Sequence, residues 1–138
     1  MNYTRIGLAF LGAAVVYFVC GFIMLAALPA MKAEFLKYPN VYRSQEDMMK
    51  VMPYNMVAIL VSIFVVAVFY AQMYPVGGGI ASGTYFGALV GIFAVCTCCI
   101  HNYALLKIGL ALMLWEGITY FVQWVIVGAT IGLIYRPS

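Results

Sequence analysis

Four long apolar stretches, separated by shorter polar segments, make up most of this chain. They run roughly over Ile6–Leu28, Met56–Tyr74, Thr84–Asn102 and Ile108–Ile134, and Glu116 is the only acidic or basic residue inside them. A helix needs about 20 apolar residues to cross the hydrocarbon core of a bilayer. Since lipid cannot hydrogen-bond the backbone, each stretch predicts a transmembrane helix. The pattern therefore predicts an all-α membrane protein with four transmembrane helices in a compact bundle.

The first connection, from Pro29 to Pro53, is long and carries most of the charges. Within it, "SQEDMMKVMP" predicts a short helix with Ser44 as N-cap, Asp47 close to a capping-box position, and Pro53 as its end. Methionines alternate with charges in this segment, which favours a helix lying at the membrane interface. An ordinary solvated helix is the open alternative.

The other two connections are short. The sequence "YPVGGGIASG" predicts a tight reversal between the second and third helices, because Pro75 and Gly77–Gly79 interrupt a helix. Little more than "YALLK" joins the last two helices, so they are expected to form a close antiparallel hairpin. The first apolar run is longer than the core of a signal peptide and is interpreted as a retained transmembrane helix.

Composition supports a lipid environment. The chain has 138 residues, enough for one domain over 1–138, and is 67% hydrophobic and only 8% charged. An average soluble domain is about 25% charged. We expect a multi-pass protein of the cell (inner) membrane. The net charge of +3 is too small and too scattered for nucleic-acid binding.

The distribution of lysine and arginine predicts an orientation in the membrane. Arg5 and Arg136 lie on the side of the two termini. Five cationic residues lie on the other side, in the first and third connections: Lys32, Lys37, Arg43, Lys50 and Lys107. The count favours these two connections in the cytoplasm.

Glu116 is the clearest candidate functional residue. An ionised carboxylate at membrane depth is expensive, so Glu116 should face the bundle interior. Thr119, Tyr120 and Gln123 follow at i+3, i+4 and i+7 and form a polar stripe with it. The stripe is either an interhelical hydrogen-bond network or a site for protons or a ligand. Possible partners on the other helices are Tyr17, Ser62, Tyr70 and Tyr85.

The hexapeptide "CTCCIH" holds three cysteines and the only histidine. On a regular helix, Cys96 and Cys99 share one face, and Cys98 and His101 share another about 160–200° away. Ligands so arranged cannot converge on one zinc ion, so no metal site is expected, and the cysteines are interpreted as packing residues. His101 is interpreted as a hydrogen-bonded residue at the membrane boundary. The alternatives are a proton relay and a haem or chlorophyll-type ligand.

Glycines recur at four-residue spacing, as is typical of closely packed transmembrane helices. The third helix carries Gly83, Gly87 and Gly91, and the fourth carries Gly128 and Gly132. Their partner is either a helix of the same chain or a second copy.

Three stretches together resemble a large uncharacterised family of small four-span prokaryotic membrane proteins. They are an Arg–x–x–acidic pattern in "YRSQEDMMKVMP", a glycine turn in "GGGIASGTYFGALVG", and the ending "GATIGLIYRP". The resemblance covers most of the chain and implies the four-helix architecture, with no assigned activity. "CTCCIH" is not part of the pattern.

No nucleophile–base pair, phosphate loop or paired carboxylates are visible in the sequence, so a non-enzyme is expected. A membrane enzyme like the small four-helix glutathione-transferase-like proteins would carry an Arg/Asn/Glu constellation that this sequence lacks. The expected function is that of an accessory or scaffold subunit, packed against other membrane proteins or against itself in the bilayer. The alternatives are a small transporter or channel using the stripe around Glu116, and a cofactor-binding subunit using His101.

Overall fold

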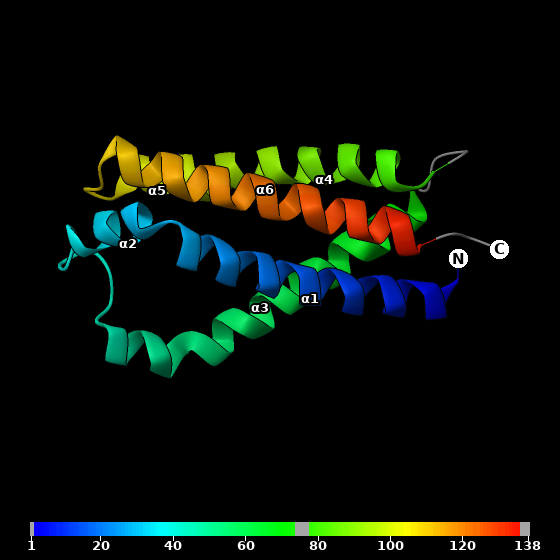
Figure 1. Cartoon of the computed structure of the whole chain (residues 1–138), viewed down its shortest axis with the longest axis horizontal. Helices are drawn as coiled ribbons and strands as arrows, with labels where there is room; N and C mark the ends of the chain where they lie inside the picture. Colours follow the sequence, from blue (N-terminus) through cyan, green and yellow to red (C-terminus); the bar gives the residue numbers. More distant parts are fainter. Residues whose placement is uncertain (1, 74–77, 136–138) are drawn as a thin grey trace.

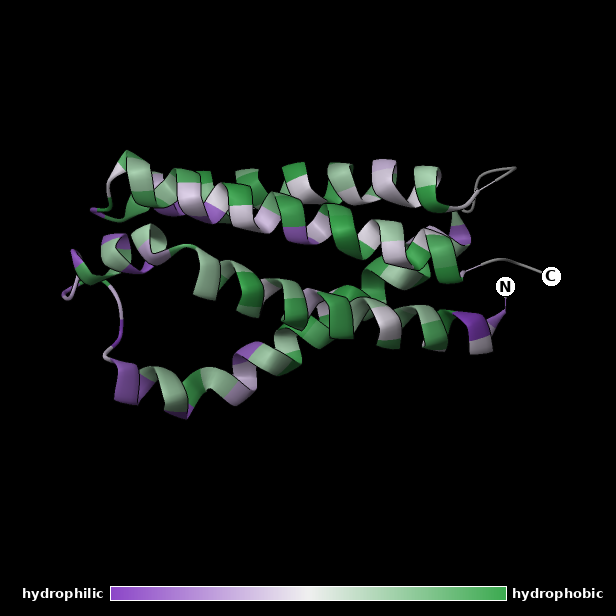
Figure 2. Ribbon diagram, in the orientation of Figure 1, coloured by the Kyte–Doolittle hydropathy of each residue, from purple (hydrophilic) through white to green (hydrophobic). Residues whose placement is uncertain are grey.

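The computed structural model describes residues 2–73 and 78–135, which form helices and the turns between them. In chain order the helices are α1 (Tyr3–Ala27), α2 (Pro29–Leu36), α3 (Gln45–Gln72), α4 (Ile80–Ala94), the π-helix η1 (Val95–Ile100), α5 (His101–Leu105) and α6 (Leu110–Ile134). Since η1 and α5 continue α4, four helices are long and apolar enough to cross a membrane. The predicted all-α fold with four such helices is confirmed. Hydrophobic residues cover the four long helices, and hydrophilic ones gather mainly at the two ends of the molecule (Figure 2).

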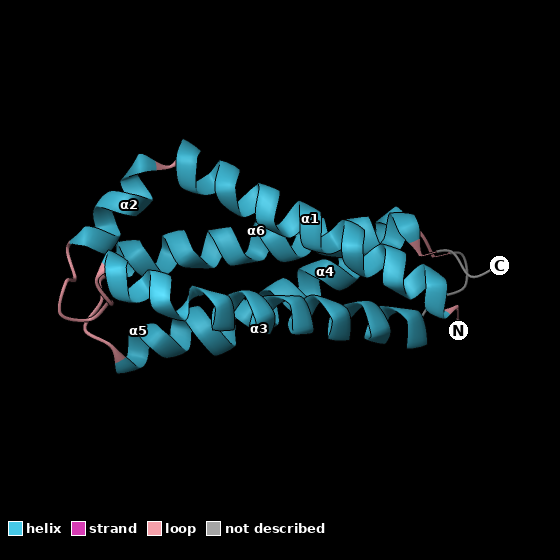
Figure 3. Ribbon diagram, turned by 90° about the horizontal axis from the view of Figure 1, so that it is seen from below, coloured by secondary structure: helices cyan, strands magenta, loops and turns pink. Residues whose placement is uncertain are grey.

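Helix α6 lies at the centre of the bundle, between α4 and α1 (Figures 1 and 3). Helices α4 and α6 approach closely because glycines face each other. A Cβ atom on Gly83 would lie 2.7 Å from the Cα of Gly132, and one on Gly87 would lie 2.9 Å from the Cα of Gly128. A Cβ on Gly91 would lie 3.0 Å from the ring of Phe121. The glycine stripes therefore meet within one chain.

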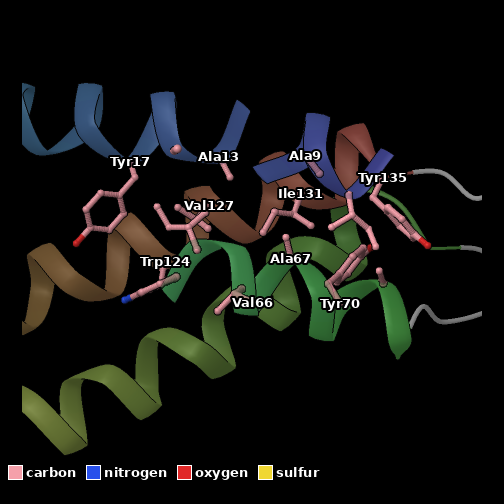
Figure 4. Packing of buried hydrophobic residues seen from close by; sticks show 14 residues of the cluster. Ala9, Ala13, Tyr17, Val66, Ala67, Tyr70, Trp124, Val127, Ile131 and Tyr135 are labelled. Atoms are coloured by element: carbon pink, nitrogen blue, oxygen red, sulfur yellow. The ribbon is translucent and has the colours of Figure 1, made fainter. Parts of the chain in front are cut away.

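The hydrophobic core joins α1, α3 and α6 (Figure 4). Small residues of α1, Ala9 and Ala13, are fully buried against Val127 and Ile131 of α6. The rings of Tyr70 and Tyr135 meet edge to face at one end of this core, with centroids 6.3 Å apart. Only the second half of α3 packs into this core.

Helix α3 differs most from expectation. Ser44 is its N-cap, as predicted, with its hydroxyl accepting a hydrogen bond from the Asp47 N–H at 3.2 Å. The prediction of a separate short helix ending at Pro53 is wrong, because α3 continues through Pro53 to Gln72. A proline in a helix interior costs about 3 kcal/mol, less than leaving several backbone groups unpaired in lipid. The short helix of the first connection is instead α2, which begins with Pro29.

The first half of α3 leads away from the other helices (Figure 1). The buried residues of α3 all lie between Ile63 and Ala71. Among the described residues from 45 to 58, none is buried. The bundle is therefore open on one side at the end where the first connection lies.

The remaining turns follow the glycine and hairpin patterns. Gly79 precedes α4 with φ of +134°, a conformation that favours glycine. Residues 74–77 of the expected reversal, which include Pro75 and Gly77, lie outside the described residues. The link from α5 to α6 is short, as expected. The start of α1 and the end of α6 lie at the same end of the molecule (Figure 1).

Candidate intramembrane cleft

A cleft of about 1000 Å³ lies between α6 and the diverging part of α3. Glu116, Thr119, Tyr120 and Gln123 all line it, because their spacing places them on one face of α6. Residues of α1, α2, α4 and η1 complete the walls. The structure thus gathers the whole predicted stripe at a single site.

The walls of the cleft are mostly apolar and aromatic. Tyr17 and Trp124, whose ring centroids are 5.9 Å apart, belong both to the hydrophobic core and to the cleft. Facing them across the space, α3 contributes methionines, Asn55 and Ser62. A concave apolar space with a few convergent polar groups is the usual form of a site for a small molecule.

Glu116 is only 9% exposed, and its carboxyl group contacts the first connection. The Tyr42 hydroxyl donates a hydrogen bond of 3.1 Å to Glu116 Oε1. Glu116 Oε2 has no hydrogen bond to any residue that the structure describes. An oxygen that was fully enclosed would be buried without a partner, and the described residues contain no such side-chain oxygen or nitrogen. Oε2 therefore reaches open space.

Tyr42 is held in place by its neighbours. Its ring packs edge to face on Phe35, with centroids 5.0 Å apart. Nearby, the Tyr38 hydroxyl accepts a hydrogen bond of 2.8 Å from the Gly109 N–H, just before α6. Burial, followed by the adjacent Glu116 carboxylate, raises the pKa of Tyr42, so its hydroxyl stays protonated and remains a donor.

Gln123 is the most enclosed polar residue of the stripe, with 6% exposure. A Cβ on Gly21 of α1 would lie 2.8 Å from Gln123 Nε2, so this glycine leaves room for the amide. No hydrogen bond joins the side chain of Gln123 or of Tyr120 to another described residue. The amide of Gln123 is therefore free to bind a group within the cleft.

The Thr119 hydroxyl bonds within α6 and contacts α2. It donates to the Trp115 carbonyl oxygen of its own helix at 2.8 Å, and it contacts the Met31 sulfur of α2 at 3.7 Å. The hydrogen bonds of the stripe thus link α6 to itself, to α2 and to the first connection. They do not link it to α1, α3 or α4 within the described parts of the chain.

Two of the four suggested partners lie at the stripe and two do not. Tyr17 and Ser62 line the cleft, although the Ser62 hydroxyl donates to the Ala58 carbonyl at 2.9 Å. Tyr70 and Tyr85 instead line a separate hollow of about 480 Å³. The Tyr70 hydroxyl donates to the Gly79 carbonyl at 3.3 Å. The suggestion that these two meet the stripe was wrong, since Tyr70 near the end of α3 and Tyr85 near the beginning of α4 both line this other hollow.

Sequence reasoning missed Tyr42, because it sought partners for Glu116 only on the spanning helices. A usable signal was present. The first connection and the beginning of the fourth helix lie on the same side of a four-helix bundle, so a hydroxyl of that connection is a natural partner.

The prediction for "CTCCIH" assumed a regular α-helix, and this assumption is wrong. Residues Val95–Ile100 form a π-helix, a rare form that often occurs at functional sites. Cys99 is buried, Cys98 lines the cleft, and Cys96 and His101 are exposed. All four cysteines are free thiols. Within the described ranges, no three His, Cys, Asp or Glu side chains are grouped so that they could hold a metal ion.

Comparison with family models, curated proteins and solved structures found no significant match. The resemblance to the small four-span prokaryotic family stays a prediction.

Proposed function

We propose that this protein is a non-catalytic membrane protein that binds a small amphipathic molecule in the cleft beside α6, as the binding step of a small transporter. The observation that carries the proposal is Gln123. This residue is 6% exposed and lines the cleft, and its side-chain amide has no hydrogen-bond partner among the described residues. An unpaired amide in an apolar setting costs free energy that a bound polar group can recover.

The geometry favours this function over a purely structural network. A network that fixed the bundle would connect the spanning helices, whereas the hydrogen bonds of Glu116 and Thr119 go to Tyr42 and Met31. The volume of about 1000 Å³ lies at the upper end of the range for sites of drug-sized ligands. Apolar walls suit the body of an amphipathic molecule, and the stripe suits its polar group.

We also propose a location and an orientation. Four apolar helices suit the cell (inner) membrane, and the lysine and arginine count favours the first and third connections in the cytoplasm. Glu116 lies near the beginning of α6, beside the first connection. The polar end of the cleft then faces the cytoplasmic half of the bilayer.

An accessory or scaffold subunit remains a second candidate, because the first half of α3 is unpacked. Its apolar side chains Met49, Tyr54 and Val57 are well exposed. A transmembrane helix of another protein, or of a second copy, would then occupy the space beside α3. His101 lies outside the cleft, and neither candidate uses it.

Native mass spectrometry of protein purified in mild detergent tests the proposal. The wild type should carry a small-molecule adduct, and Gln123→Leu should lose most of it. Gln72→Leu, at the exposed end of α3, is the matched control and should keep the adduct. A bare wild-type chain would contradict ligand binding, and a stable complex with a second polypeptide would favour the accessory-subunit candidate.

A further inference from the structure

Glu116 differs from the other acidic residues of the chain in having no counter-charge among the residues that the structure describes. The sequence holds four acidic residues. Glu34 pairs with Lys37, and Lys50 contacts Glu46 at 3.2 Å and Asp47 at 3.1 Å. No lysine, arginine or histidine of the described residues pairs with Glu116. The acidic residue in the most apolar surroundings is thus the one that no described cation pairs with.

The lining of the cleft has the same imbalance. Among the described residues that line it, Glu116 is the only acidic one and none is basic. One of its oxygens is held by Tyr42, and the other faces the open space. An anionic group entering the cleft would meet a carboxylate and no positive charge, whereas a cationic group would supply the charge that Glu116 lacks.

We propose that the cleft takes lipophilic cations, molecules that carry an amine or onium group on an apolar body, with Glu116 as their counter-charge. This inference rests on the proposed ligand-binding function and names its substrate class. The charge complementarity is local, since it depends on one carboxylate within an apolar wall.

Aromatic rings around the carboxylate fit the same class. Tyr120 lies one turn beyond Glu116 on the same face of α6, and Trp124 one turn further. Tyr17 of α1 packs against Trp124 and also lines the cleft. The faces of tyrosine and tryptophan rings attract cations, most strongly where water is excluded. Neutral amphipathic molecules would use the apolar walls and Gln123 but would bring no charge to compensate that of Glu116.

Binding of three aromatic probes of different charge tests the proposal. The full chain is placed in phosphatidylcholine nanodiscs and titrated with tetraphenylphosphonium, neutral triphenylmethanol and tetraphenylborate, with empty nanodiscs as the background. The variant Glu116→Gln keeps the size of the side chain and an oxygen that accepts from Tyr42. Glu46→Gln, at the exposed start of α3 and outside the cleft, is the control for loss of a carboxylate.

The wild type and Glu46→Gln should bind the cation at least about tenfold more tightly than the neutral probe, and the anion least. Glu116→Gln should abolish this preference while its affinity for the neutral probe is unchanged, which also shows that the variant is folded. Equal wild-type affinities for the cation and the neutral probe, or a preference that survives in Glu116→Gln, would overturn the inference but leave ligand binding intact. If no probe binds above background, the proposed function itself fails.

Discussion

Replacing the interfacial glycines by alanine should separate α4 from α6 and destabilise the bundle. An added Cβ at Gly87 would lie 2.9 Å from the Cα of Gly128 and would also meet the Trp124 carbonyl oxygen. At Gly83 the added atom would lie 2.7 Å from the Cα of Gly132. The atoms in the way belong to backbone, so no side-chain rotation relieves the contact.

The cost follows from the distances. Moving the Cα of Gly132 from 2.7 Å to the 3.4 Å of ordinary contact requires the helices to part by at least about 0.7 Å, because the Gly128 carbonyl oxygen lies nearer still. A gap of this size forfeits roughly a quarter to a half of the dispersion energy of each contact. Helix association in lipid depends chiefly on such packing, and overpacking typically costs about 1–3 kcal/mol. We expect Gly83→Ala and Gly87→Ala each to lower the free energy of unfolding by about this amount.

Unfolding in mixed micelles, followed by circular dichroism and tryptophan fluorescence, measures the effect. Two glycine-to-alanine controls have room for the added carbon. Gly7 has nothing within 4 Å of that position, and at Gly117 the nearest atom is Val95 Cγ1 at 3.5 Å. Alanine is the better helix former by about 0.5–1 kcal/mol, so both controls should be neutral or stabilising. If the interfacial variants matched the controls, the close approach of α4 and α6 would be refuted.

Three further predictions concern the first connection and α3. Ser44→Ala should lower the free energy of unfolding by about 1 kcal/mol because it removes the N-cap of α3, whereas Ser62→Ala should leave it nearly unchanged. Unfolding in micelles compares the two variants, and equal losses would contradict the cap. Tyr42→Phe should lower the free energy of unfolding by about 1 kcal/mol and speed amide hydrogen exchange in residues 37–44, because Glu116 Oε1 loses its hydrogen-bond donor. An unchanged exchange rate would argue against this hydrogen bond. Pro53→Ala should restore a helical hydrogen bond, stabilise the first half of α3 by up to about 3 kcal/mol and slow its amide exchange; unaltered exchange rates would count against a continuous α3.

The spanning helices were predictable because lipid leaves the backbone no alternative to a helix. The fourth helix ends at Ile134 as expected, and the first was expected over Ile6–Leu28 and forms over Tyr3–Ala27. The beginning of α3 was not predictable from the rule that proline ends a helix. That rule describes local preference, and the cost of one lost hydrogen bond is outweighed when the following residues must be helical.

Hydropathy fixes which residues enter the membrane, and it does not fix the angles between helices. The stripe from Glu116 to Gln123 was found from its spacing alone. The cleft that it lines depends on the direction of α3 and was not foreseen. The hydrogen bond from Tyr42 joins residues 74 positions apart, so no local pattern contains it. The π-helix at Val95–Ile100 was likewise not predicted, because the faces of "CTCCIH" were assigned with the spacing of a regular α-helix.

Photo-crosslinking from α6 in native membranes tests most directly whether the cleft holds a small molecule. A benzoylphenylalanine at Tyr120 points into the cleft, whereas one at Ile118, which is 51% exposed and outside the cleft, serves as the matched control. Intact-mass analysis after irradiation should show a distinct small-molecule adduct at position 120 and only bulk lipid at position 118. Identical lipid adducts at both positions, or a crosslink from position 120 to a polypeptide, would contradict the account.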